Sequence, residues 1–250
     1  MDVGPTIFVT LTFVLAGFVK GVIGLGLPTV GMGLLAVVMT PAQAAALLVA
    51  PSFITNVWQA VGARSLPLVQ RTWPMLLGSC VGTWGLGFLA GPSLLSADNG
   101  MRASIGLGIV LALYGLLGLT AIKFVVPARY EFWLSPVIGV ITGLVTVATG
   151  VYMIPSAPYL QAIGLEKDNL VLAMGISFTV STLALAAVLV ADGALPTGVA
   201  GASLLALVPA AIGMALGQWL RMRVSPRVFR ISFFAGSLLL GADLVLRALI

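Results

Sequence analysis

One lysine and two glycine-rich breaks lie inside long apolar stretches of this chain, and these residue types are suited to holding an anion. The breaks span residues 21–28 and 142–155, and Lys20 directly precedes the first. A break leaves backbone N–H groups without helical partners, and a helix N-terminus attracts anions. Glycine also lets a ligand approach the backbone closely. We therefore expect ligand contacts at Lys20, Gly21, Gly24, Gly26, Thr29, Thr142, Gly143, Thr146, Thr149 and Gly150.

The position of the breaks favours a binding role. A broken helix at membrane depth is tolerated only where its backbone is buried in protein or lines a wet cavity. Paired breaks in the two halves of a chain are typical of the binding sites of secondary transporters. The alternative is that Gly, Ala and Thr only allow helices to pack closely in lipid.

Lys20 lies about 22 Å along its predicted helix, well inside the hydrocarbon region. A lysine there costs roughly 2.5–3.5 kcal/mol on insertion and marks a functional site by default. We expect its ammonium group to line a cavity and pair with an anion. The alternative is a tilted hairpin that lets the side chain reach an interface.

Two polar pairs, Thr55-Asn56 and Ser181-Thr182, lie in the middle of apolar stretches and could donate hydrogen bonds to the same ligand. Serine and threonine in membrane helices often bond back to the carbonyl four residues earlier. Asn56 is the best candidate of the four, because an amide in lipid needs a partner.

Asp243 and Arg247 are spaced i, i+4 near the end of the last apolar stretch, which predicts a local ion pair. Asp243 is also the one carboxylate within a predicted span, and so the one candidate for proton coupling.

The composition is that of an integral membrane protein. Of 250 residues, 60% are hydrophobic and 8% are charged, with a net charge of +5, whereas soluble domains carry about 25% charged residues. The chain has no histidine and a single cysteine, Cys80, so no internal disulfide can form. No Ser or Cys in the spans has a visible base partner. We expect no cofactor, no metal site, no enzyme activity, no nucleic-acid partner and no cleaved signal peptide.

Length and hydropathy divide the chain into eight membrane elements. About 20 apolar residues cross a bilayer. On this basis single spans are predicted at 42–62, 72–92, 101–122, 170–190, 195–219 and 229–249. Residues 5–39 and 132–163 are too long for one span, and each contains a break, so each is predicted to be a hairpin of two short helices.

Basic residues predict the orientation of these elements. Loops rich in Lys and Arg stay in the cytoplasm, and four loops carry nine of the twelve basic residues: Arg64, Arg71, Lys123, Arg129, Lys167, Arg221, Arg223, Arg227 and Arg230. The second hairpin must then enter and return from the inside, and the first from the outside, with both termini outside. This predicts an all-α membrane domain over 1–250 made of two inverted-topology repeats, 1–125 and 126–250. Each repeat is a broken hairpin followed by three spans.

The order of these features resembles the sulfite exporter TauE/SafE family of small membrane transporters. Residues 142–155 fit the family pattern of a small residue, Gly, two aliphatics, a run of small residues, and aliphatics ending in Pro155. The first copy matches the second where residues 19–23 lie over 141–145. It departs from the pattern at Leu27-Pro28, which replaces two glycines, and at Gly33, which stands where the second copy has proline.

The resemblance implies a transporter of small sulfur-containing anions, such as sulfite, thiosulfate or organosulfonates, in the bacterial cytoplasmic membrane. An anion channel is the alternative, because paired re-entrant elements would also serve a pore. The expected partners are a small anion and the lipid bilayer, and a homo-oligomer is left open.

Overall fold

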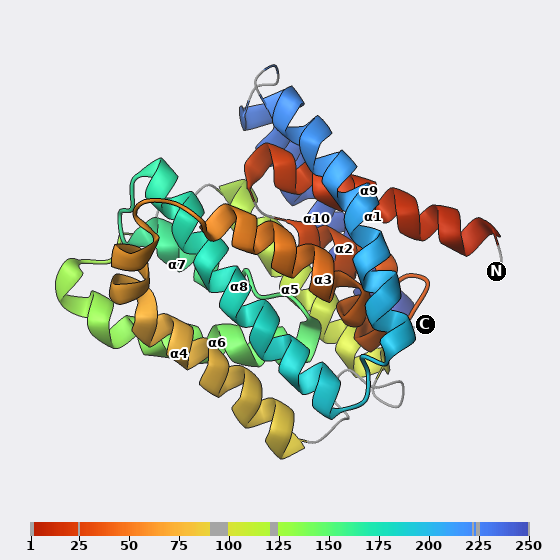
Figure 1. Cartoon of the computed structure of the whole chain (residues 1–250), viewed down its shortest axis with the longest axis horizontal. Coiled ribbons are helices and arrows are strands. Elements are labelled where there is room, and N and C mark those ends of the chain that lie inside the picture. The colour runs from red at the N-terminus through yellow and green to blue at the C-terminus, as the bar shows by residue number, and fades with distance from the viewer. Residues whose placement is uncertain are drawn as a thin grey trace. The chain divides into compact units, whose positions relative to one another are not determined.

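The computed structural model describes residues 3–24, 26–90, 100–120, 125–221, 223 and 226–249. These residues form helices and no strand (Figure 1). The helices are α1 Val3–Ile23, α2 Leu27–Leu35, α3 Pro41–Ala60, α4 Ser65–Ala90, α5 Gly100–Thr120, α6 Ala128–Thr149, α7 Ser156–Ala162, α8 Lys167–Ala191, α9 Thr197–Arg221 and α10 Pro226–Leu249.

The two predicted breaks separate α1 from α2 and α6 from α7. Gly24 and Gly26 have φ of 79° and 112°, and Gly150 has φ of 73°. Gly24 and Gly150 follow the ends of α1 and α6, and Gly26 precedes the start of α2. Such left-handed conformations are inexpensive only for glycine. Pro28 then lies in the first turn of α2, where proline is well tolerated because no helical N–H is lost. Local chemistry therefore accounts for both breaks.

The predicted lengths of the hairpin helices are wrong. Instead of two short helices, each hairpin has a long helix of 21 or 22 residues followed by a short one of 9 or 7. Gly17 and Gly21 remain helical within α1, as do Gly139 and Gly143 within α6. Each of these glycines packs against the backbone of a neighbouring helix. Both long helices are apolar enough to cross a membrane.

Six described helices meet the length and hydropathy expected of a membrane span: α1, α5, α6, α8, α9 and α10. The predicted spans at 42–62 and 72–92 correspond to α3 and α4, which are long but less apolar. Many large apolar side chains face outward, among them Trp58, Trp73, Trp133 and Trp219. The chain is therefore a multi-pass membrane protein.

The chain forms two compact units, and each takes helices from both predicted repeats. Unit 1 comprises Met1–Pro51, Leu95–Ile122 and Pro196–Ile250, and unit 2 comprises Ser52–Leu94 and Lys123–Leu195. Unit 1 thus holds the first break with α5, α9 and α10. Unit 2 holds the second break with α4 and α8, which run side by side (Figure 1).

Facing glycines join two helices in unit 1. A Cβ added to Gly17 or Gly21 of α1 would overlap a backbone carbonyl oxygen of α9, and one added to Gly213 or Gly217 of α9 would overlap a carbonyl oxygen of α1. The glycines are spaced four apart on each helix, as in membrane helices whose backbones approach closely.

Unit 2 contains a contact of the same kind. Gly139 and Gly143 of α6 face carbonyl oxygens of α4, and Gly78 and Gly82 of α4 face carbonyl oxygens of α6. The helix that precedes each break is therefore held by glycine packing against one neighbour.

The second hairpin returns to the end of unit 2 where it began. The Val126 N–H donates to the Ala162 carbonyl at 2.8 Å, joining the residues before α6 to the end of α7. Arg71 of α4 binds Glu131 of α6 through Nε–Oε1 at 2.7 Å and also donates to the Ile163 carbonyl at 3.1 Å. The start of α6 and the end of α7 are thus fastened together.

Candidate functional site

The second break brings a tyrosine into the buried interior of unit 2. α6 ends where the Gly150 N–H donates to the Thr146 carbonyl at 2.7 Å, and the chain then runs without helix to Pro155. Tyr152 lies in this segment and is almost fully buried. Its ring packs against Phe178 of α8, with the centroids 5.4 Å apart.

Asn56 joins this break to both predicted polar pairs. Its Nδ2 donates to the Tyr152 hydroxyl at 3.2 Å and to the Thr182 Oγ1 at 3.4 Å. Residues from α3, the break and α8 therefore meet at one point. Ser52, four residues before Asn56 on α3, is buried and its hydroxyl has no hydrogen-bond partner in the described part of the chain. The Tyr152 hydroxyl accepts from Asn56, so its own proton remains available to an acceptor.

Several other hydroxyls are buried in unit 2 without a partner. Among the described residues Ser79, Thr142, Ser177 and Ser181 make no hydrogen bond with their side chains. Buried polar groups are normally paired, and an orphaned one calls for water, an ion or a functional reason. Thr142 and Ser181 are predicted site residues, whereas Ser79 and Ser177 are not.

Four predicted threonines are already paired within their own helices. Thr182 Oγ1 donates to the Phe178 carbonyl at 2.7 Å. Thr146 Oγ1 donates to the Thr142 carbonyl and Thr149 Oγ1 to the Val145 carbonyl, both at 2.7 Å. Thr55 Oγ1 donates to the Ser52 carbonyl at 3.3 Å. A hydroxyl proton used in this way is not offered to an anion, so these side chains are weaker candidates than Asn56.

Lys20 lies in the last turn of α1, directly before the first break, and its residue is 4% exposed. A cation in this position complements the negative end of the helix dipole. Gly26 and Thr29 beyond the break are also buried. A Cβ at Gly26 would lie 2.7 Å from a Val19 methyl carbon, so the segment is tightly packed.

Gly21 and Gly143 have a packing role in the structure. Their Cα atoms press against the backbones of α9 and α4, which leaves no room for a side chain. The close helix contact accounts for glycine at both positions. Gly24 and Gly150 differ, because their positive φ values form the breaks themselves.

The predicted residues are divided between the two units. Lys20, Gly21, Gly24, Gly26 and Thr29 belong to unit 1, and the others to unit 2. Unit 2 brings Asn56, Thr182 and the second break together. A single site shared by both breaks stays a prediction.

Tyr152 is the residue that the sequence analysis missed. Its signal was a phenol inside a glycine–proline break, away from the aromatic residues of the interfaces. The described residues contain no group of three His, Cys, Asp or Glu side chains placed to hold a metal ion.

Comparison with known proteins identifies the family. The model of the family described as sulfite exporter TauE/SafE matches residues 9–244. No curated protein and no solved structure matches the chain. The match includes all of α2 to α9 and both breaks. The chain therefore belongs to the sulfite exporter TauE/SafE family of membrane transporters.

Proposed function

We propose that this protein is a secondary transporter that moves a small anion across the bacterial cytoplasmic membrane by alternating access between two helical breaks. The family match over residues 9–244 carries the proposal. The substrate would be a sulfur oxyanion or organosulfonate, of the sulfite, thiosulfate or sulfoacetate type.

The polar interior of unit 2 supports an oxyanion as the ligand. Tetrahedral oxyanions accept several hydrogen bonds, and the site offers neutral donors: the Tyr152 hydroxyl and the unpartnered hydroxyls of Ser177 and Ser181. Neutral donors can stabilise an anion without adding a second buried charge, which would need its own partner. On this proposal Lys20 supplies a positive charge from the first break.

The inverted repeat is part of the proposal. Gly213 and Gly217 of α9 meet the carbonyls of Val14 and Phe18, and Gly78 and Gly82 of α4 meet those of Pro136 and Val140. The α1 and α6 residues in these contacts are related by the same offset that aligns residues 19–23 with 141–145. The helices that precede the breaks, α1 and α6, therefore pack in the same register on α9 and α4, each of which belongs to the other half of the chain.

The contact between α5 and α10 has the form that such a repeat requires. Gly108 of α5 faces Gly241 of α10, whereas Gly115 faces Leu238, so the two helices run antiparallel. These are the last helices of the two proposed repeats. A two-fold axis in the membrane plane would relate the two repeats and would exchange α5 with α10. Two helices that pack together across such an axis run antiparallel.

The orientation rests on the loops of unit 2. Arg64 after α3 pairs with Glu166 before α8 at 3.2 Å, and Arg71 pairs with Glu131 near the start of α6. Three loops with basic residues thus meet at one end of the unit. The excess of Lys and Arg favours a cytoplasmic location for that end, and on this proposal both termini lie outside.

Flux into proteoliposomes tests the proposal. We expect uptake of sulfite, thiosulfate or a sulfonate that saturates with concentration and is accelerated by the same anion trapped inside. Anion conductance that rises with voltage and shows no counterflow would instead establish a channel. Absence of flux for every sulfur anion, with an active reference carrier in parallel vesicles, would refute the proposed substrate class.

A further inference from the structure

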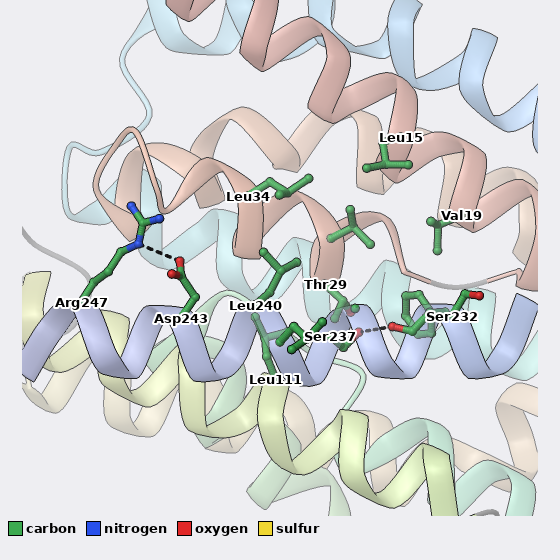
Figure 2. Close-up of a pocket in the computed structure, with 14 residues that line it drawn as sticks. Leu15, Val19, Thr29, Leu34, Leu111, Ser232, Ser237, Leu240, Asp243 and Arg247 are labelled. Atoms are coloured by element: carbon green, nitrogen blue, oxygen red, sulfur yellow. Dashed lines mark hydrogen bonds and ion pairs between the residues drawn. The ribbon is translucent and has the colours of Figure 1, made fainter.

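A pocket of about 510 Å³ lies within unit 1, between α1, α2, α5 and α10. Its walls are mostly aliphatic, with Leu15 of α1, Leu34 of α2, Leu111 of α5 and Leu240 of α10 facing the same space (Figure 2). The hydroxyl residues among its lining are Thr29, Ser232 and Ser237. Such walls suit a hydrocarbon chain. A small oxyanion would gain little from them, because it needs hydrogen-bond donors.

The pocket ends at a pair of opposite charges. Arg247 Nε lies 2.8 Å from Asp243 Oδ2, and both groups border the pocket near the C-terminal end of α10 (Figure 2). Their side chains are 62% and 42% exposed. The apolar stretch of α10 ends at Ala248, so this pair lies where the hydrocarbon region gives way to headgroups.

The pocket extends along most of the apolar stretch of α10. Ser232 and Arg247 are its outermost lining residues on this helix, and a helix rises about 22 Å between them. This is about three quarters of the roughly 30 Å hydrocarbon thickness of a bilayer, which is enough for one acyl chain with its headgroup at the charged end. Leu15 and Leu239 on its rim are 48% and 71% exposed, so a chain could enter sideways from the lipid.

The charged end selects a headgroup with both signs of charge. Arg247 has N–H donors beyond the one that Asp243 uses, and these fit a phosphate. Asp243 has a second carboxylate oxygen, which can accept from a primary ammonium group. The Asp243 carboxylate would repel a purely anionic headgroup. A quaternary ammonium headgroup has no N–H to donate to this carboxylate.

We propose that this pocket, referred to below as the groove, binds an aminophospholipid of the phosphatidylethanolamine type. Its phosphate contacts Arg247, its ammonium contacts Asp243, and one acyl chain lies between α1 and α10. The lipid would fill the apolar groove and stabilise the packing of α1 and α2 on α10.

Lipid retention by the purified protein tests the proposal. The protein is delipidated in detergent and incubated with equal amounts of phosphatidylethanolamine, phosphatidylcholine and phosphatidylglycerol, and bound lipid is counted by native mass spectrometry. We expect phosphatidylethanolamine to be retained about fivefold over either competitor, which corresponds to roughly 1 kcal/mol from one charge contact at the interface. Asp243→Asn should remove this preference, because only phosphatidylethanolamine offers a primary ammonium group to the carboxylate. Arg247→Gln should lower the retention of all three lipids, because they share the phosphate. Both side chains are exposed, so the protein should stay folded.

Two glycine variants test the position of the lipid. A Cβ at Gly236, which lines the groove, or at Gly201 of α9 meets no atom within 4 Å. Gly236→Leu should therefore fill the groove and lower phosphatidylethanolamine retention, whereas Gly201→Leu should retain it. Equal retention of the three lipids by the wild type, full preference in Asp243→Asn, or undiminished retention in Gly236→Leu would overturn the proposal. The readout does not involve transport, so it is independent of the proposed substrate.

Discussion

The side-chain amide of Asn56 lies 3.2 Å from the hydroxyl of Tyr152 and joins α3 to the second break. The two residues are 96 positions apart in the sequence. The Asn56 amide donates to both the Tyr152 hydroxyl and the Thr182 Oγ1. The phenol oxygen of Tyr152 is therefore an acceptor in its contact with Asn56. The phenol proton then remains available to an acceptor.

Tyr152→Phe tests this donor. Loss of a hydrogen bond to a charged ligand costs about 1.5–3 kcal/mol, so anion affinity should fall roughly tenfold to a hundredfold. Isothermal titration with sulfite measures the change. Tyr114→Phe is the matched control, because Tyr114 is equally buried but lies in unit 1. Unchanged affinity in a folded Tyr152→Phe protein would remove the residue from the site.

Lys20→Met tests the proposed charge contact. Two unit charges about 4 Å apart at an effective dielectric near 20 attract by roughly 4 kcal/mol. Desolvation of both ions removes much of this, so a net one to two kcal/mol, about ten- to thirtyfold in affinity, should be lost. Lys20→Arg should retain more binding, because it keeps the charge. If the Met variant binds as tightly as the wild type, Lys20 has no contact with the substrate.

Gly150→Leu tests the second break. A side chain there should block the approach of an anion to the backbone, and transport should be lost while the protein still inserts. Gly164 has nearly the same left-handed φ, 72° against 73°, and open space around it. Gly164→Leu therefore carries the same backbone strain, about 1–2 kcal/mol, without obstructing the break. The idea fails if both variants transport equally well. Gly24→Leu is expected to behave as Gly150→Leu.

Gly143→Ala tests the packing role of the glycine pairs. Its Cβ would collide with the Ser79 carbonyl oxygen, so α4 and α6 must move apart. Overpacking of this kind typically costs about 1–3 kcal/mol, and thermal unfolding should occur at a lower temperature. Gly85→Ala on α4 adds the same methyl group in open space and should leave the midpoint unchanged. Equal midpoints for the two variants would show that the contact tolerates a side chain.

Arg71→Met tests the closure of the second hairpin. Glu131 is 15% exposed in its side chain and would lose both bonds to the guanidinium group. We expect a loss of about 1–3 kcal/mol, since a largely buried charge is left unpaired. Arg64→Met is the control: its ion pair with Glu166 is exposed and should contribute about 0–1 kcal/mol. Unfolding midpoints in one detergent compare the two, and equal shifts would contradict the assignment.

Cysteine labelling tests the orientation. In a Cys80→Ala background, a cysteine at Val61 in the α3–α4 loop should react only with reagent inside the cell, and one at Thr197 at the start of α9 only with reagent outside. Both positions are exposed. Reaction of the Val61 cysteine from outside would invalidate the proposed topology.

The sequence by itself determined the membrane class, the family and the places where two helices break. These are local properties: hydropathy selects lipid over water, and Gly24, Gly26 and Gly150 each adopt a backbone conformation that other residues resist. The Asp243–Arg247 pair was predictable for the same reason, because i, i+4 spacing on one helix places the two side chains together.

The tertiary structure alone decided which of these residues pack and which remain open. Gly21 and Gly150 read alike in the sequence, yet Gly21 presses on the backbone of α9 whereas Gly150 forms the break. The partnership of Tyr152 with Asn56 was equally hidden. It depends on the rotation of α3 and on the path of the chain after α6, both of which are set by contacts between segments far apart in the sequence.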